Sequence, residues 1–490
     1  MKLKVKILNF SAGKPVCMIN EKTAEKISLH VGNRVSIEKK DKKAISIVDI
    51  SQGLNPEVIG VSNEIVKTLN LKAGENIEVK IVSKPHSIEL IKKKIKGQEL
   101  KKQEIQEVVN DISKNALTDA EIAFFISAIN DRGMSFKETK NFVHAMVKSG
   151  KRLRLRGKVA DKHSFGGVAG NRTTPIIISI CSNENLVMPK TSSRAITSAA
   201  GTADTIETLA KVDFSIKQIK KILSKTNACF VWGGTLGLAP TDDKIIRVGR
   251  IVKIDPISQA LASILSKKIS VDSKYILIDI PYGRSAKLGK HKAEKLKRKF
   301  IKLGKIFNLD IEVVLTNGSE PIGRGVGPIL EMRDIIKVLK KEKDMPEDLE
   351  KKSIMLSGML LEMTGKAKKG KGEELAQEIL DSGKAWKKFQ EIIKAQQGKI
   401  KKLIPGKLTH KIKAKRNLKI SHINNKLINS LARTAGCPED KAAGIYLNKI
   451  KGESAKKGEI IMTIHATSEE KLKHATSFYN KNKKGMIEFR

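Results

Sequence analysis

Residues 161 to 204 contain a dense group of glycines and polar side chains suited to binding an oxyanion. Glycines at positions 166, 167 and 170 let backbone amides approach a ligand closely. Hydroxyl groups and positive charges accompany them: Ser164, Thr173, Thr174, Ser192, Ser193, Thr197, Ser198, Thr202, Lys162, Arg172, Lys190 and Arg194. No other stretch of the sequence combines these features, so residues 161 to 204 are predicted to form a phosphate site.

A helix is expected to follow the glycines, although two local signals disagree. The run Ile-Ile-Ile-Ser-Ile at 176–180 favours a strand, whereas Thr174 followed by Pro175 is typical of an N-cap and first helical turn. We predict a buried helix, whose N-terminus would attract an anion. The glycines match neither the nucleotide-triphosphate loop, which ends in Gly-Lys-Ser/Thr, nor the dinucleotide Gly-x-Gly-x-x-Gly spacing.

The central part of the chain alternates apolar strands with helices, which predicts an α/β domain. Buried strands are expected at Thr226–Trp232, Tyr275–Ile280 and Ile311–Leu315, and helices at Ile257–Lys268 and Ala286–Leu303. Gly323–Pro328 is expected to be a tight turn. Short strands near Ile445 and Ile460 indicate a further α+β domain after Pro405.

The first 84 residues contain an internal repeat. Six positions from Asn20 to Ile37 recur 42 residues later, between Ser62 and Val79, as a short helix, a glycine turn and an alternating strand. Two such units predict a small pseudo-symmetric β-barrel, similar to a double-psi barrel, with a role in assembly. From Pro85 to about Lys158 the apolar period becomes helical, and capping boxes begin at Thr118 and Ser135.

The composition restricts the class of protein. The formal net charge is +43, which suggests nucleic-acid binding, but only 4% of residues are aromatic and the lysines are spread over every region. We expect a solvated basic surface rather than a specific nucleic-acid site. The four cysteines are far apart and predict neither a zinc site nor disulfides, and no apolar run is long enough to span a membrane. A cytoplasmic protein is the expectation.

The central motif resembles that of the pyrimidine nucleoside phosphorylase family, and in particular its archaeal branch, the AMP phosphorylases. Asp-Lys-His-Ser-Phe-Gly-Gly at 161–167 is similar to the family signature. The second loop at 191–204, the segments at 255–268 and 281–287 and the N-terminal barrel also resemble that branch. The likeness covers nearly the whole chain.

The resemblance implies a multidomain α/β and α+β fold. An N-terminal barrel (residues 1–84) is followed by a helical domain (85–158) that is discontinuous, because residues 240–269 should fold beside it. A central α/β phosphate-binding domain (159–405) and a small C-terminal α+β domain (406–490) complete the expected architecture. Family members use no metal or organic cofactor, and the likeness suggests a homodimer or a larger assembly.

The implied reaction is attack of inorganic phosphate on the anomeric carbon of AMP, which gives adenine and ribose 1,5-bisphosphate; CMP and UMP are further candidate substrates. The expected phosphate contacts are Lys162, Ser164, Thr174 (or Thr173, because this loop is one residue longer than in thymidine phosphorylases), Ser192 and Thr202. The expected AMP contacts are Gly167, Ser193, Arg194, Ala195, Ile196, Thr197, Ser198, Thr202, Ser263 and Lys287. Asp255 is the implied proton donor to the leaving base, provided that burial raises its pKa, and His163 is a supporting residue.

Three alternatives remain at this point. Thymidine or uridine could replace the nucleotide as substrate. An enzyme similar to anthranilate phosphoribosyltransferase would share glycine-rich phosphate loops but would need magnesium. From another class, an RNA-binding protein on a degenerate phosphorylase scaffold would account for the high positive charge.

Overall fold

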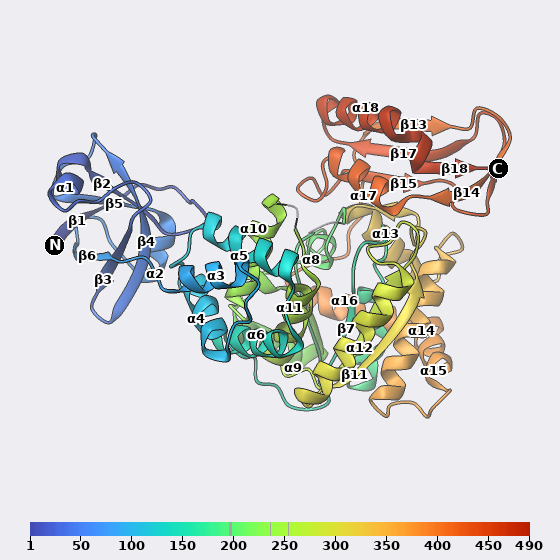
Figure 1. Ribbon diagram of the computed structural model, residues 1–490. Helices are drawn as coiled ribbons and strands as arrows, with labels where there is room; N and C mark the ends of the chain where they lie inside the picture. Colours follow the sequence, from blue (N-terminus) through green and yellow to red (C-terminus); the bar gives the residue numbers. More distant parts are fainter. Residues whose placement is uncertain (196–197, 236, 253) are drawn as a thin grey trace. The chain divides into compact units, whose positions relative to one another are not determined.

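A computed structural model describes residues 1–195, 198–235, 237–252 and 254–490. Figure 1 shows the chain as a ribbon coloured along the sequence. By its internal contacts the chain divides into two compact units. Unit 1 comprises Met1–Gly150 and Ala239–Ser266, and unit 2 comprises Lys151–Leu238 and Lys267–Arg490. Each unit is therefore assembled from segments that are distant in the sequence. The four domain boundaries expected from the sequence stay predictions.

The first part of unit 1 is a closed barrel of six strands in the order β1-β5-β2-β4-β3-β6. Its elements are β1 (Lys2–Ile7), β2 (Val16–Asn20), α1 (Glu21–Lys26), β3 (Arg34–Lys39), β4 (Lys42–Ser51), β5 (Val58–Val61), α2 (Asn63–Leu69) and β6 (Asn76–Val82). The 42-residue repeat recurs in three dimensions, since β2, α1 and β3 each begin 42 residues before β5, α2 and β6. Gly32 and Gly74 occupy equivalent turns with the same φ of 83°, a conformation that favours glycine.

The rest of unit 1 is helical. Its helices are α3 (Ser87–Ile95), α4 (Lys102–Ser113), α5 (Asp119–Arg132), α6 (Phe136–Ser149), α10 (Pro240–Val252) and α11 (Ile257–Ser270), the last of which ends in unit 2. The capping boxes predicted at Thr118 and Ser135 are confirmed at the starts of α5 and α6. Thr241 on α10 donates a hydrogen bond to the carbonyl of Val109 on α4, 3.1 Å away. The segment Ala239–Ser266 is therefore joined to the segment Met1–Gly150 by a buried polar contact as well as by packing.

Unit 2 contains a parallel three-stranded sheet, β11-β10-β7, and a parallel pair, β8-β9. The strands are β7 (Ala160–Ser164), β8 (Met188–Ser192), β9 (Ala228–Trp232), β10 (Tyr275–Tyr282) and β11 (Asp310–Asn317). The strand expected at Ile311–Leu315 is confirmed as β11, but its expected burial is wrong, because β11 forms a sheet edge on which only Val313 is buried. The predicted helix at 286–303 begins later, at Lys290, after Gly289 as the N-cap.

The predicted buried helix is confirmed as α7 (Thr174–Cys181), in which every residue is buried. Its N-cap is Thr173 rather than Thr174, since the first turn starts one residue earlier than the Pro175 signal indicated. Burial on all sides overrides the strand preference of its isoleucines. The other helices of this part are α8 (Thr202–Ile206), α9 (Ile216–Thr226), α12 (Lys290–Ile306), α13 (Pro328–Leu339), α14 (Glu347–Met363), α15 (Gly372–Asp381) and α16 (Lys384–Ala395).

The last part of unit 2 combines strands with two helices. Its elements are β12 (Gly325–Val326), β13 (Leu408–Lys413), β14 (Leu418–Ile423), α17 (Asn425–Thr434), β15 (Gly444–Leu447), β16 (Ser454–Ala455), β17 (Ile460–Ala466), α18 (Glu469–Met486) and β18 (Ile487–Phe489). The strands predicted near Ile445 and Ile460 are confirmed as β15 and β17. The tight turn expected at 323–328 is not formed, because Gly325 and Val326 form the short strand β12, which pairs with β15 and ties this part to the α/β part. Among the described residues, no helix is long and apolar enough to cross a membrane.

Candidate active site

The first loop, residues 165–173, connects β7 to α7 and is built around Lys162. The Lys162 ammonium is buried and donates a hydrogen bond to Thr173 Oγ1 at 2.8 Å, while the carboxylate oxygen Asp279 Oδ2 is 4.0 Å away. Burial lowers the pKa of Lys162 to about 7, because desolvation outweighs the attraction of Asp279. The charge of Lys162 is thus incompletely compensated by the protein.

Asp279, in the middle of β10, organises the polar groups around Lys162 and Ser164. Its carboxylate accepts hydrogen bonds from Ser164 Oγ at 3.0 Å and Thr316 Oγ1 at 2.6 Å, and it lies 3.0 Å from the ammonium of Lys352. Burial alone would raise the pKa of Asp279, but Lys352 and Lys162 outweigh it and lower the pKa. Asp279 remains ionised and orients Ser164, a residue predicted to contact phosphate.

Two glycines of the first loop are required by close contacts. A Cβ added at Gly167, where φ is 98°, would lie 3.1 Å from Lys287 Cβ, and one at Gly170 would lie 2.1 Å from the carbonyl oxygen of Ile322. The ammonium of Lys287 lies 4.8 Å from the centre of the Phe165 ring. The structure thus brings Lys287 beside the glycines, although 120 residues separate it from Gly167 in the sequence.

The second loop, residues 193–201, is organised by Asp204 on α8. Its fully buried carboxylate accepts hydrogen bonds from the backbone amides of Ala195 at 2.7 Å and Gly201 at 2.8 Å, and from Arg194 at 3.1 Å. Ser192 ends β8 and Ser193 begins the loop, while Ser198 Oγ donates to the carbonyl of Ala200. Ile196 and Thr197, which were predicted to contact the nucleotide, lie outside the described residues.

Arg194 is already engaged within the protein. It makes two hydrogen bonds to Glu207, at 2.6 and 2.8 Å, and its guanidinium lies 4.8 Å from the centre of the Trp232 ring. The hydrogen bonds from Arg194 lower the pKa of Glu207 to about 2. Arg194 therefore has two carboxylates as counter-charges, in contrast to Lys162.

Arg172 links the two loops. Its guanidinium donates to Glu331 at 2.7 Å, to the carbonyl of Ala200 at 2.6 Å and to Thr202 Oγ1 at 3.3 Å. Thr202, expected to contact both substrates, starts α8. Arg172, a residue of the first loop, thus holds the hydroxyl of Thr202 in place at the end of the second loop.

His163 is surrounded by positive charges. Two residues before His163 in β7, Asp161 pairs with the ammonium groups of Lys190 and Lys268. Desolvation of the imidazole, together with Lys190, Lys268 and Lys162, lowers the pKa of His163 well below its usual value. The ring is therefore neutral at pH 7, which argues against a role as general acid.

Asp255 and Ser263 belong to unit 1. Ser263 on α11 is buried, and its hydroxyl donates to Asp242 at 2.8 Å. Gln259, one turn earlier on α11, donates to the other oxygen of Asp242 at 3.2 Å. Asp255 precedes α11 and is exposed, so the burial expected of a proton-donating carboxyl is not provided here. Asp255 and Ser263 thus lie in unit 1, whereas the other described residues predicted for the site lie in unit 2.

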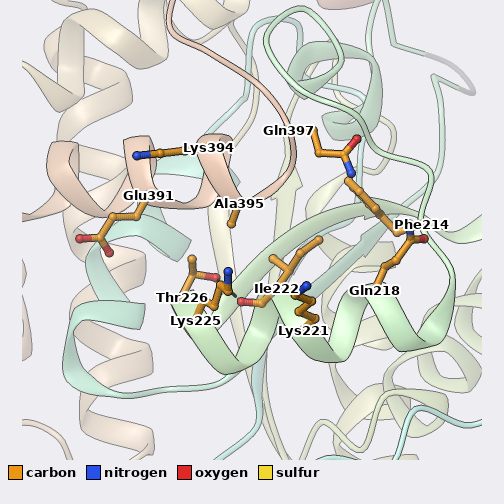
Figure 2. Close-up of a pocket in the computed structure, with 10 residues that line it drawn as sticks. All are labelled: Phe214, Gln218, Lys221, Ile222, Lys225, Thr226, Glu391, Lys394, Ala395 and Gln397. Carbon is orange, nitrogen blue, oxygen red and sulfur yellow. Dashed lines mark hydrogen bonds between the residues drawn. The ribbon is translucent and has the colours of Figure 1, made fainter.

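A separate cavity of about 590 Å³ lies between α9 and α16 in unit 2 (Figure 2). Its lining consists of Phe214, Gln218, Lys221, Ile222, Lys225, Thr226, Glu391, Lys394, Ala395 and Gln397. None of these residues was predicted to belong to the site, and none of them contributes to the two loops. The cavity is therefore not part of the candidate active site.

Sequence reasoning did not assign roles to Asp279 or Asp204. Asp279 had one available signal, since it is a charged residue inside the buried run of β10. Asp204 follows Gly201 by three residues, the spacing of a capping box, and its carboxylate does accept from the Gly201 amide.

Family models match three segments of the chain. A glycosyl transferase family helical bundle domain matches residues 88–150, and a glycosyl transferase family a/b domain matches residues 156–386. A pyrimidine nucleoside phosphorylase C-terminal domain matches residues 419–484.

Several curated proteins are similar over almost their full lengths. The AMP phosphorylase of Thermococcus kodakarensis is 42% identical over 97% of this chain and 95% of its own. That of Methanocaldococcus jannaschii is 40% identical over 96% of this chain and 95% of its own. Among solved structures, the anthranilate phosphoribosyltransferase of Thermus thermophilus aligns with a TM-score of 0.53 at 17% identity. The alignment covers 63% of this chain and 99% of the other, a likeness of fold alone.

Proposed function

Since the chain belongs to the AMP phosphorylase family, we propose that it cleaves AMP with inorganic phosphate. The oxygen of phosphate forms a bond to the anomeric carbon, the bond from that carbon to adenine breaks, and ribose 1,5-bisphosphate leaves. The observation that carries the proposal is the buried, incompletely compensated ammonium of Lys162 beside Thr173 at the start of α7. An anion placed there would gain both a charge-assisted hydrogen bond and the field of the helix N-terminus.

The attacking phosphate is assigned to Lys162, Ser164, Thr174, Ser192 and Thr202. The site should orient the dianion without neutralising it completely, because a fully paired phosphate would be a poor nucleophile. Asp279 supports this balance, since it offsets part of the charge of Lys162. The hydroxyl of Ser164 donates to Asp279, so it must turn from that carboxylate to donate to the phosphate. Thr173 stays the alternative to Thr174, since its hydroxyl accepts from Lys162 and keeps its own proton to donate to an anion.

The nucleotide is assigned to Gly167, residues 193–198, Thr202, Ser263 and Lys287. For the 5′-phosphate we favour Lys287 over Arg194, because Arg194 already pairs with Asp204 and Glu207. Ser263 donates its proton to Asp242, which leaves the oxygen of its hydroxyl able to accept from an amino group of the base.

Asp255 is assigned as the proton donor to the leaving adenine, with His163 as a supporting residue that orients groups in its neutral form. The carboxyl of Asp255 is exposed in the structure, so the bound base itself must supply the desolvation that favours the protonated form. Asp255→Asn should lower kcat by about 100-fold or more while changing the KM for AMP much less, as is usual for loss of a general acid. Steady-state kinetics would measure this, and a near-normal kcat would exclude the role.

Adenine release tests the proposed reaction directly. The purified protein is incubated with AMP and phosphate, and free adenine and ribose 1,5-bisphosphate are quantified, with a phosphate-free reaction as control. Equal release without phosphate, or none at all, would refute phosphorolysis. Parallel reactions with CMP, UMP, thymidine and uridine define the substrate class, and a reaction with a chelator separates this chemistry from a magnesium-dependent transfer.

Three further assignments accompany this function. We assign the N-terminal barrel to the double-psi type, because its strands form two equivalent sets with parallel pairs β1-β5 and β2-β4. A homo-oligomer, dimer or larger, and a cytoplasmic location are proposed from the family likeness. Light scattering coupled to size exclusion would measure the assembly.

A further inference from the structure

We propose that Asn425 and Asn429 on α17 are positioning residues that fix the separation between the first and second loops. The inference rests on the proposed phosphorolysis, in which one loop holds the attacking phosphate and the other the nucleotide. The two asparagines are four residues apart and therefore lie on one face of the helix. Both are buried, with 0% and 4% of their surface exposed.

Asn425 holds the first loop against two other segments. Its side-chain oxygen accepts from the amide of Ala169 at 3.0 Å. Its side-chain nitrogen donates to Ser285 Oγ at 3.0 Å and to the carbonyl of Gly318 at 2.9 Å. These three partners are all distant in sequence, and one of them, Ser285, is two residues before Lys287.

Asn429 bridges the two loops themselves. Its side-chain oxygen accepts from the amide of Ala199 in the second loop at 3.0 Å, and its nitrogen donates to the carbonyl of Gly167 in the first loop at 3.4 Å. The shorter of these is the stronger hydrogen bond. The methyl groups give an independent observation: Ala169 and Ala199 are both fully buried in the hydrophobic core that includes Ile428, Leu431 and Ala432 of α17.

The role follows from the geometry of the reaction. Phosphate and the anomeric carbon must be held at a near-attack distance, and a displacement of about 1 Å can cost about 100-fold in rate. Each loop has its own ligand groups, but α17 spans both loops as a rigid element. Changes at Asn429 should therefore affect the reaction of the two bound substrates more than the binding of either one.

The test is a set of variants on one helix. Asn429→Ala removes both bridging hydrogen bonds and should lower kcat by about 10- to 100-fold, with the KM values for AMP and phosphate changing by less than about threefold. Asn429→Asp keeps an acceptor for Ala199 but turns a second oxygen toward the carbonyl of Gly167 and buries a carboxylate, so its kcat should be no higher than that of Asn429→Ala.

Asn424→Ala is the matched control. Asn424 is the N-cap of α17, and its side chain accepts from amides of that helix, at Lys426 and Leu427. Its loss should lower the Tm but leave kcat unchanged at temperatures well below unfolding. The inference is overturned if Asn429→Ala keeps kcat within about threefold of the unmodified protein, if Asn424→Ala loses as much, or if Asn429→Asp restores kcat to within about threefold of the unmodified protein.

Hydrogen–deuterium exchange tests the positioning role without relying on activity, so it distinguishes an error in this inference from an error in the proposed function. Asn429→Ala should speed exchange in peptides covering 165–173 and 193–201, and Asn424→Ala should not. If the unmodified protein does not cleave AMP, the proposed reaction is wrong. Unchanged exchange in both loops of Asn429→Ala would overturn the positioning role whatever the activity.

Discussion

The first and second loops both combine a cation with hydroxyl groups, a chemistry suited to binding anions, yet they compensate their cations differently. Lys162 in front of the first loop has one carboxylate oxygen at 4.0 Å and a neutral hydroxyl at 2.8 Å. Arg194 in the second loop has direct hydrogen bonds to two carboxylates and a ring beneath it. The first cation keeps part of its charge uncompensated, whereas the second is held by two carboxylates that belong to the protein.

In the proposed function, this difference suits the two loops to two different substrates. A site for an attacking phosphate needs charge that the ligand itself completes. A loop that shapes a nucleotide pocket needs a fixed backbone, and Asp204 provides it by accepting from two amides of the loop. Positive charge in a sequence motif therefore does not by itself identify a ligand contact.

Removing the first cation should have the largest effect. Lys162→Ala deletes the buried ammonium, so kcat/KM for phosphate should fall by about 100- to 1,000-fold, with a smaller change in the KM for AMP. Initial rates at varied phosphate would measure this. Lys369→Ala, at an exposed surface position, is the control, and unchanged saturation by phosphate in Lys162→Ala would contradict the assignment.

Disrupting the second loop should have a different and smaller effect. Asp204→Ala leaves the part-buried amides of Ala195 and Gly201 without their acceptor, at a cost of about 1 kcal/mol each. We expect the KM for AMP to rise by about 10- to 100-fold while the KM for phosphate changes by only a few-fold. An equal rise in both KM values would erase the distinction between the loops.

The smallest effect is a pH dependence. The pKa of Lys162 is lowered to about 7, so its charged form predominates below pH 7 and is lost as the pH rises. Binding of sulfate, which does not titrate in this range, should weaken by about tenfold for each pH unit above 7. Calorimetry between pH 6 and 8, over which the affinity should fall by about tenfold, would measure it. Lys162→Arg, which stays charged, should remove the dependence; a pH-independent affinity in the unmodified protein would show that Lys162 does not bind the anion.

Local features of the chain could be predicted from the sequence. The capping boxes at Thr118 and Ser135 are formed by residues three positions apart, and α7 is marked by a proline in its first turn. The signature at 161–167 could also be found in the sequence, because its glycines and polar residues are contiguous.

The supports of the site could not be predicted, because their partners are far away along the chain. Asp279 meets Ser164 across 115 residues, and Asn429 meets Ala199 across 230 residues. No periodicity or spacing within a short window reports such pairs. The exposure of β11 was missed for a similar reason, since an apolar run does not reveal whether its strand has a neighbour on both sides.

The 42-residue repeat means that neither copy can form the barrel by itself. If β1, β2 and β3 are assigned to the first copy and β4, β5 and β6 to the second, every strand pairing in the barrel joins one copy to the other. Neither copy contains a sheet of its own. A peptide of one copy would have to self-associate to close a barrel, so the present domain has the architecture of a fused homodimer.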